Sequence, residues 1–197
     1  MNIYIYQYES FADFESVFLT TFMHGSANII SVSETGGLTI AESGLKMAAD
    51  HKTADVLIED IDLFVIPGGD FKKALSDIAL PLLLKQLDKS NTDIIGICGG
   101  VFLLAQAGIL KNRRCTGNSN GLDAQNEDVV QYFENTSIID ADIVTDGNVI
   151  TATGQSFIEL GCEVEMRWGG TTKKQMREDY KWWKNSNSPW EKKLYSE

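Results

Sequence analysis

The chain has 197 residues, of which 43% are hydrophobic, and this length and composition are those of one globular domain rather than of a disordered segment. Its 17 basic and 28 acidic residues give a formal net charge of −11, which argues against nucleic acid or anionic membranes as partners. No apolar run reaches the about 20 residues that a bilayer requires, and no secretory signal opens the chain. Three widely spaced cysteines fit a reducing compartment, so we expect a cytoplasmic protein.

Strand and helix signals alternate along the first part of the chain. The β-prone run Asn2–Gln7 predicts a first strand. Ser10-Phe11-Ala12-Asp13 resembles a capping box and predicts an amphipathic helix that continues to about His24. Two further strands are expected at Asn28–Ser33 and Leu38–Ala41.

Two short runs in the middle of the chain are apolar on both faces. Ile61–Ile66 is stopped by Pro67-Gly68-Gly69, and Asp93–Cys98 is stopped by Gly99-Gly100. Such runs are typical of strands buried in the middle of a parallel sheet. Between them, Pro81–Lys89 predicts a helix with its proline in the first turn.

The second half of the chain continues the alternation. We expect a buried helix at Val101–Ala107, a hairpin of the strands Ile138–Thr145 and Asn148–Ala152, and a helix from about Ser156 to Trp168. This order of elements predicts an α/β fold with a mainly parallel sheet covered by helices. The active sites of such sheets lie at the carboxyl ends of the central strands, where both glycine-rich stops fall.

One motif carries chemistry. Gly96-Ile97-Cys98-Gly99-Gly100 fits the pattern G-x-C-x-G between a buried strand and a buried helix, which is the thiol form of the nucleophile elbow. The sharp turn needs small neighbours and holds the nucleophile in a strained backbone conformation. The alternative is a small buried hydrophobic residue in a glycine-rich turn, since free cysteine is often buried.

The position of Cys98 predicts how its thiol is activated. The thiol would face the positive end of the following helix, which favours the thiolate and predicts a lowered pKa. Backbone N–H groups after Cys98, together with that of Gly69 on the neighbouring loop, would form an oxyanion hole.

The segments Asp62–Gly69 and Ile94–Gly100 closely resemble the ThiJ/PfpI superfamily, and the likeness continues in order to about residue 168. It implies a three-layer, flavodoxin-like sandwich of the class I glutamine amidotransferase type over residues 1–170, and a homodimer. It implies Cys98 as the reactive cysteine, Glu15 as the carboxylic acid beside it, and Gly69 and Gly99 as the oxyanion-hole amides. Beside a thiolate, the Glu15 carboxyl would have a raised pKa. No metal or cofactor is expected.

The sequence departs from the hydrolytic members of that superfamily at the expected position of the catalytic histidine. Gly99 follows the cysteine directly, and a second place that can supply histidine is matched by Asn118. Asn118 could orient a neighbour by hydrogen bonding but cannot accept a proton as a base. His24 and His51 are expected to be ordinary surface residues. A complete Cys–His–acid triad is therefore not visible.

The remaining features are outside this motif. Residues 171–197 carry several tryptophans among charged residues and predict a helical extension packed on the same domain, a partner contact being the alternative. Cys162 is expected in the core. Cys115 follows two arginines, which would lower its pKa if it were a second redox thiol, and a loop cysteine without function is the alternative.

Three functions fit these residues. The first is a cysteine-dependent hydrolase, amidase or lyase that acts on a small molecule through Cys98, with Glu15 as proton partner. For this function the resemblance suggests dicarbonyls such as methylglyoxal. The second is a non-enzymatic redox sensor or stress-response protein in which Cys98 is oxidised. The third is a scaffold that binds a partner through its tryptophan-rich tail.

Overall fold

A computed structural model describes residues 1–117 and 131–184 of the chain. Its main sheet has seven strands in the order β10-β11-β7-β6-β1-β2-β5, and every pairing except that of β10 with β11 is parallel. Two small two-stranded sheets, β3-β4 and β8-β9, lie outside it. The strands are β1 (Asn2–Tyr6), β2 (Asn28–Ser33), β3 (Leu38–Ile40), β4 (Lys46–Ala48), β5 (His51–Lys52), β6 (Leu63–Ile66), β7 (Asp93–Ile97), β8 (Arg114–Cys115), β9 (Ser137–Ile138), β10 (Ile143–Asp146) and β11 (Val149–Ala152).

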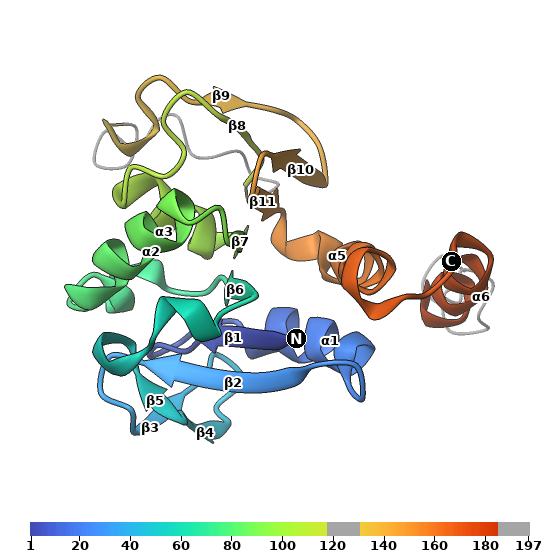
Figure 1. Ribbon diagram of the computed structural model, residues 1–197, viewed down its shortest axis with the longest axis horizontal. Helices are drawn as coiled ribbons and strands as arrows, with labels where there is room; N and C mark the ends of the chain where they lie inside the picture. Colours follow the sequence, from blue (N-terminus) through green and yellow to red (C-terminus); the bar gives the residue numbers. More distant parts are fainter. Residues whose placement is uncertain (118–130, 185–197) are drawn as a thin grey trace, which may run out of the picture.

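Helices cover both faces of the sheet. Figure 1 shows α2 and α3 on one side and α1 and α5 on the other. The α-helices are α1 (Asp13–Met23), α2 (Ala79–Lys89), α3 (Gly99–Gln106), α5 (Phe157–Val164) and α6 (Lys173–Lys184). The predicted three-layer α/β fold with a mainly parallel, flavodoxin-like sheet is confirmed.

Alternate residues of the central strands supply two separate hydrophobic cores. In β6, Phe64 and Ile66 join the core under α2 and α3, whereas Leu63 and Val65 join the core under α1 and α5. All four side chains are completely buried. The apolar run is therefore explained by a strand with no solvent-facing side. No helix of the described residues is long and apolar enough to cross a membrane.

The predicted capping box at the start of α1 is wrong. The helix begins at Asp13, its N-cap is Ala12, and no side chain caps it. Ser10 instead has a left-handed backbone with φ of +62°. Its carbonyl accepts a hydrogen bond from the N–H of Asp70, and the N–H of Ala12 donates to the carbonyl of Gly68 at 2.8 Å. Tertiary hydrogen bonds to the loop after β6 thus take the place of a local cap.

Other boundaries differ in smaller ways. The strand expected at Ile138–Thr145 is divided, because β9 pairs with β8 whereas β10 forms the predicted antiparallel hairpin with β11. Leu38–Ile40 pairs with β4 and stays outside the main sheet. The helix predicted from Ser156 continues after α5 as a π-helical turn at Glu165–Gly169.

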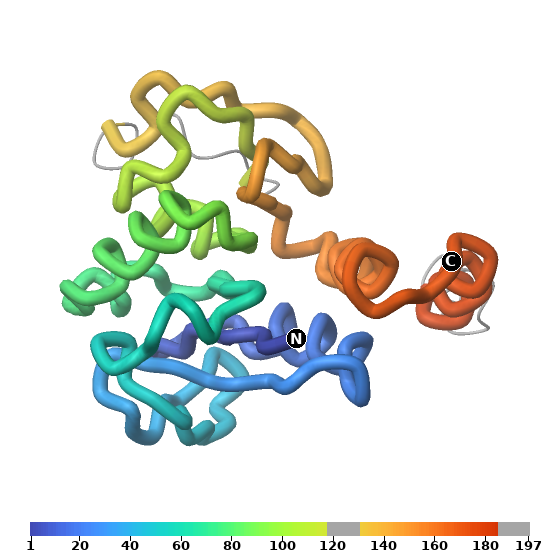
Figure 2. Tube along the Cα trace, viewed as in Figure 1, coloured from blue at the N-terminus to red at the C-terminus, as the bar shows by residue number. Residues whose placement is uncertain are grey.

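The C-terminal helix α6 packs on its own chain. The Trp183 ring lies 4.6 Å from that of Phe18 on α1, and the Tyr180 hydroxyl donates to the Glu159 carboxylate on α5 at 2.7 Å. Figure 2 shows the trace passing from α5 through the turn at Glu165–Gly169 to α6 at the outer end of the molecule. These contacts support the packed extension that we propose for residues 171–197, of which residues 185–197, with Trp190, lie outside the described part.

Four parallel strands end at one edge of the sheet, and their following residues meet there. Tyr8 follows β1, Gly68 follows β6, Cys98 follows β7 and Gly154 follows β11. Because a doubly wound sheet leaves a crevice at the carboxyl ends of its strands, this edge is where a binding site is expected.

Candidate functional site

Cys98 has the geometry of a nucleophile elbow. It lies between β7 and α3 with φ of +48° and ψ of −113°, a conformation that non-glycine residues rarely adopt. The turn has no space for larger neighbours: a Cβ at Gly96 would lie 2.5 Å from the Leu104 side chain, and one at Gly99 would lie 2.6 Å from the Gly69 carbonyl oxygen. The strained turn predicted from G-x-C-x-G is present.

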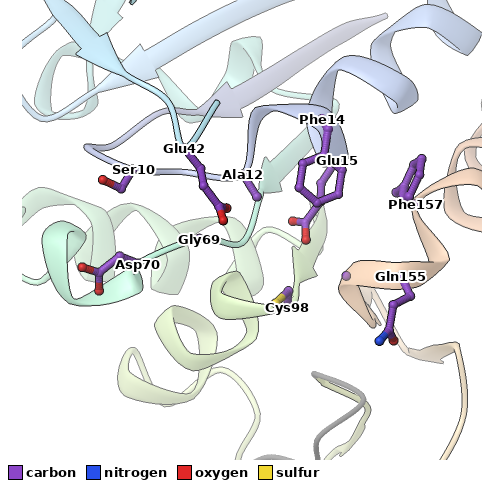
Figure 3. A pocket seen from close by; sticks show the side chains of 11 residues that line it. Ser10, Ala12, Phe14, Glu15, Glu42, Gly69, Asp70, Cys98, Gln155 and Phe157 are labelled. Carbon is purple, nitrogen blue, oxygen red and sulfur yellow. The ribbon is translucent and has the colours of Figure 1, made fainter. Parts of the chain in front are cut away.

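Glu15 reaches Cys98 from the helix α1. It projects from the first turn of α1, is 1% exposed, and accepts a hydrogen bond of 2.6 Å from the N–H of Gly68. Figure 3 shows its carboxylate pointing toward the Cys98 thiol. A Cβ on Gly154 would lie 2.7 Å from Oε1 of Glu15 and 3.3 Å from Sγ of Cys98, so both reactive atoms border one small space.

Two backbone amides act on the sulfur. The N–H groups of Gly69 and Gly99 act to lower the pKa of Cys98, which means that they stabilise its anionic form. Gly69 has φ of +110°, and a Cβ there would overlap the Ser10 carbonyl oxygen and lie 2.7 Å from Cα of Phe11. Both amides lie beside Cys98, and their role as oxyanion-hole donors stays a prediction.

The thiol is less acidic than predicted. Burial and the Glu15 carboxylate raise the pKa of Cys98 to about 11, although the amides of Gly99 and Gly69 oppose the rise. The prediction of a lowered pKa is wrong because loss of solvent and a nearby carboxylate outweigh the start of one short helix. Burial also raises the pKa of Glu15 to about 7, against the hydrogen bond from Gly68, as predicted in direction.

The raised pKa of Glu15 predicts how stability depends on pH. Glu15 keeps its proton up to about pH 7 in the folded protein but loses it near pH 4.5 when unfolded. Between these values the folded state binds more protons, so its stability falls as the pH rises. Relative to Glu15→Gln, the wild-type free energy of unfolding should fall by about 3 kcal/mol across this window. Urea titrations at several pH values measure the difference, and parallel curves for the two proteins would contradict it.

The site opens into a cavity of about 510 Å³. Phe14 and Phe157 form an apolar wall with their rings 5.4 Å apart and nearly perpendicular. Glu42 and Asp70 lie on the opposite wall, and no Lys, Arg or His is among the described residues that line the cavity. A small, partly apolar molecule without negative charge fits this lining.

The structure brings together Cys98, Glu15, Gly69 and Gly99, whereas the other candidates are elsewhere or undescribed. Asn118 lies outside the described residues. His24 and His51 are exposed and do not line the cavity. Cys115 and Cys162 are buried, and burial raises the pKa of each to about 11, so the activation by arginines considered for Cys115 is wrong. All three cysteines are free.

Gly154, Glu42 and Asp70 were not identified as site residues from the sequence. Gly154 follows the strand β11, and Glu42 lies in the turn between β3 and β4, so both come from segments distant from Cys98 in the sequence. The only local signal was at Gly154, where a glycine follows an apolar strand, as at the two recognised stops.

A doubly wound sheet with a thiol nucleophile elbow at its carboxyl edge defines the class of protein: a flavodoxin-like domain with an elbow cysteine. The model of the DJ-1/PfpI family matches residues 1–165, and the chain belongs to this family. The resemblance to the ThiJ/PfpI superfamily is thereby confirmed.

Known relatives agree with this membership. An uncharacterized protease, YoaZ, from Bacillus subtilis is 28% identical over 174 residues, covering 83% of this chain and 81% of the relative. The transcriptional regulator CdhR from Pseudomonas aeruginosa is 30% identical over 129 residues, covering 66% of this chain but 37% of the regulator. Its regulatory function belongs to a much longer protein.

Solved structures show the same fold. The DJ-1 superfamily protein Atu0886 from Agrobacterium tumefaciens has a TM-score of 0.81 at 24% identity, covering 95% of this chain and 100% of that one. DJ-1beta from Drosophila melanogaster has a TM-score of 0.75 at 17% identity, covering 91% and 95%.

Proposed function

We propose that the protein is a cysteine-dependent enzyme of the hydrolase or lyase type that acts on a small carbonyl compound. The observation that carries the proposal is the convergence of three groups around Cys98 at the edge of one cavity. These are the elbow thiol of Cys98, the buried carboxyl of Glu15 and the two N–H donors of Gly69 and Gly99.

Glu15 takes the place that histidine has in a Cys–His pair. With a pKa of about 7 for Glu15 and about 11 for Cys98, the pair holds one proton across the pH range between these values. Glu15 can accept the thiol proton as the sulfur attacks. No histidine is required for this transfer.

The first chemical step is addition of the thiol to the carbonyl carbon. The sulfur–carbon bond forms, the electron pair of the carbonyl moves to its oxygen, and the N–H groups of Gly69 and Gly99 stabilise that oxygen. Glu15 removes the proton from sulfur and returns it to the oxygen, giving a neutral adduct. This step is common to a hydrolase and to a lyase acting on a dicarbonyl.

The cavity lining indicates the substrate class. Glu15, Glu42 and Asp70 present carboxyl groups, and the described lining offers no compensating cation. An anionic substrate would be repelled, whereas a neutral carbonyl compound would contact Phe14 and Phe157. Methylglyoxal, which the family resemblance suggests, is neutral and fits these requirements.

A redox sensor is the second candidate, and fewer observations support it. Glu15 and the two amides could stabilise an oxidised sulfur. A peroxide-sensing thiol, however, needs no cavity of about 510 Å³ with an aromatic wall. This cavity favours the enzyme.

Turnover of methylglyoxal tests the proposal. Wild-type protein should consume it, and glyoxylate, which is anionic, should react more slowly. Cys98→Ser should lower the rate by at least about 10³-fold, as loss of a covalent nucleophile does. Cys115→Ser removes a buried cysteine outside the site and should retain the rate. Rapid peroxide oxidation of Cys98 without turnover would favour the redox sensor. If neither turnover nor oxidation is observed, the scaffold function is the remaining candidate.

Three further parts of the proposal concern the location, the self-association and the partners of the protein. Three free cysteines support a cytoplasmic location. Phe14 and Val17, both nearly half exposed on α1, support self-association as a homodimer through apolar surface. The net charge of −11 supports small molecules rather than nucleic acid as partners.

A further inference from the structure

Tyr8 lies directly behind the loop that carries the site. It follows β1, is 5% exposed, and does not line the cavity. Its hydroxyl donates to the carbonyl oxygen of Gly68 at 2.6 Å and lies 3.1 Å from the carbonyl oxygen of Pro67. These are the carbonyls of two successive peptide groups.

The opposite sides of the same two peptide groups face the reactive residues. The peptide that joins Pro67 to Gly68 presents its N–H to Oε2 of Glu15 at 2.6 Å. The N–H of the peptide that joins Gly68 to Gly69 lowers the pKa of Cys98, and Gly69 and Cys98 line the same cavity. A peptide group is planar, so a hydrogen bond that fixes the direction of its carbonyl also fixes the direction of its N–H.

The peptide groups at Gly68 and Gly69 depend on tertiary contacts for their orientation. Gly68 and Gly69 have no side chains to hold them, and Gly69 has a left-handed backbone with φ of +110°. Besides the Tyr8 hydroxyl, the N–H of Ala12 also donates to the Gly68 carbonyl, at 2.8 Å. Among the described residues, two groups thus donate to this carbonyl, and the Tyr8 hydroxyl is the one that belongs to a side chain.

We propose that Tyr8 is a positioning residue, whose hydroxyl orients the two peptide groups that hold Glu15 and stabilise negative charge at Cys98. Hydrogen bonding to the carbonyls also polarises the two peptides and strengthens their N–H groups as donors. Burial raises the pKa of Tyr8, as do Glu15, Cys98, Asp70 and Glu42 around it, so the hydroxyl keeps the proton that it donates.

A matched pair of substitutions tests the inference. Tyr8→Phe removes the hydroxyl but keeps the ring, which stacks on Tyr6 at 5.6 Å. Tyr6→Phe is the control, because its hydroxyl is also buried but bonds to Asp77 at 3.1 Å, away from the loop. Both changes remove one buried hydroxyl, so they should lower the thermal midpoint of unfolding by similar amounts.

The readout is the rate at which iodoacetamide alkylates Cys98, measured against pH. Tyr8→Phe should lower the rate at neutral pH by about tenfold, which corresponds to about one pKa unit. In Tyr8→Phe, the inflection of the rate–pH curve that reports Glu15 should also lie at a higher pH than in the wild type. The reason is that the Gly68 N–H stabilises the carboxylate less well in this variant. Tyr6→Phe should keep the wild-type rate and inflection. Equal profiles for both variants, or a Tyr8→Phe profile that matches the wild type, would overturn the inference.

The role of Tyr8 rests on the proposed function, but different results would contradict the role and the function. A wild-type Cys98 that does not react at all would remove the proposed function, whereas a reactive Cys98 that is insensitive to Tyr8→Phe would remove only the role of Tyr8. If Tyr8→Phe does not fold, 4-aminophenylalanine at position 8 restores an N–H donor. That variant should react within about twofold of the wild type if donation is what matters, and a tenfold lower rate would contradict the role.

Discussion

Glu15→Gln is expected to lower turnover by about 10²–10⁴-fold, the usual contribution of a general acid–base group. Glutamine keeps the size of the side chain and its acceptor for the Gly68 N–H, but it cannot accept the Cys98 proton. The loss therefore concerns proton transfer rather than the shape of the cavity.

The pH profile of Cys98 alkylation should identify the same proton. In the wild type, the rate should rise to a plateau above about pH 7, because Glu15 and Cys98 then share one proton and a constant fraction of molecules carries it on the carboxyl. A second rise is expected toward about pH 11. Glu15→Gln should abolish the inflection near pH 7 and, by removing the repulsive carboxylate, lower the pKa of Cys98.

Glu42→Gln is the matched control for this prediction. Glu42 is an exposed carboxyl on the wall of the same cavity, and it contributes to the raised pKa of Glu15. Its loss should move the inflection to slightly lower pH and keep the turnover. Unchanged turnover in Glu15→Gln, or an inflection near pH 7 that survives in that variant, would contradict the assigned role.

Gly69→Ala is expected to have the second large effect, on stability and reactivity together. At φ of +110° an alanine is strained, and its Cβ would overlap the Ser10 carbonyl and lie 2.8 Å from the Ala12 nitrogen. These neighbours are backbone atoms and cannot rotate away. Strain and overpacking together should cost about 3 kcal/mol or more. Displacement of an oxyanion donor should lower turnover by about 10²–10³-fold.

Gly25→Ala is the control for Gly69→Ala, because it introduces backbone strain at a site away from Cys98. Gly25 has φ of +90°, but no atom lies within 4 Å of a Cβ built there. The control should therefore cost about 1–2 kcal/mol from strain alone and leave the reactivity of Cys98 unchanged. Urea unfolding and the alkylation rate measure both effects. Similar stability losses and equal rates in the two variants would mean that the Gly69 loop is not tightly held.

The elements that the sequence predicted well are those with a local cause. Ile61–Ile66 and Asp93–Cys98 are apolar on both faces, and that pattern requires burial on both sides of a sheet. The strain at Cys98 follows from the adjacent glycines, since few sequences tolerate so sharp a turn. The start of α1 was placed wrongly because the Ser10 carbonyl is held by the N–H of Asp70, which is 60 residues away in the chain.

The chemical state of the site required the tertiary structure. Sequence position alone suggested a lowered pKa for Cys98, whereas burial and the carboxylate of Glu15 raise it. Gly154, Glu42 and Tyr8 come from three other segments, and only the strand order places them around or behind the thiol. The sequence by itself thus determined the fold and the strained turn that holds Cys98, because local patterns of burial and turn geometry encode both. The pKa of Glu15, the charge of the cavity and the contacts behind the loop were decided by the tertiary structure, because they depend on groups that are distant in sequence and adjacent only after folding.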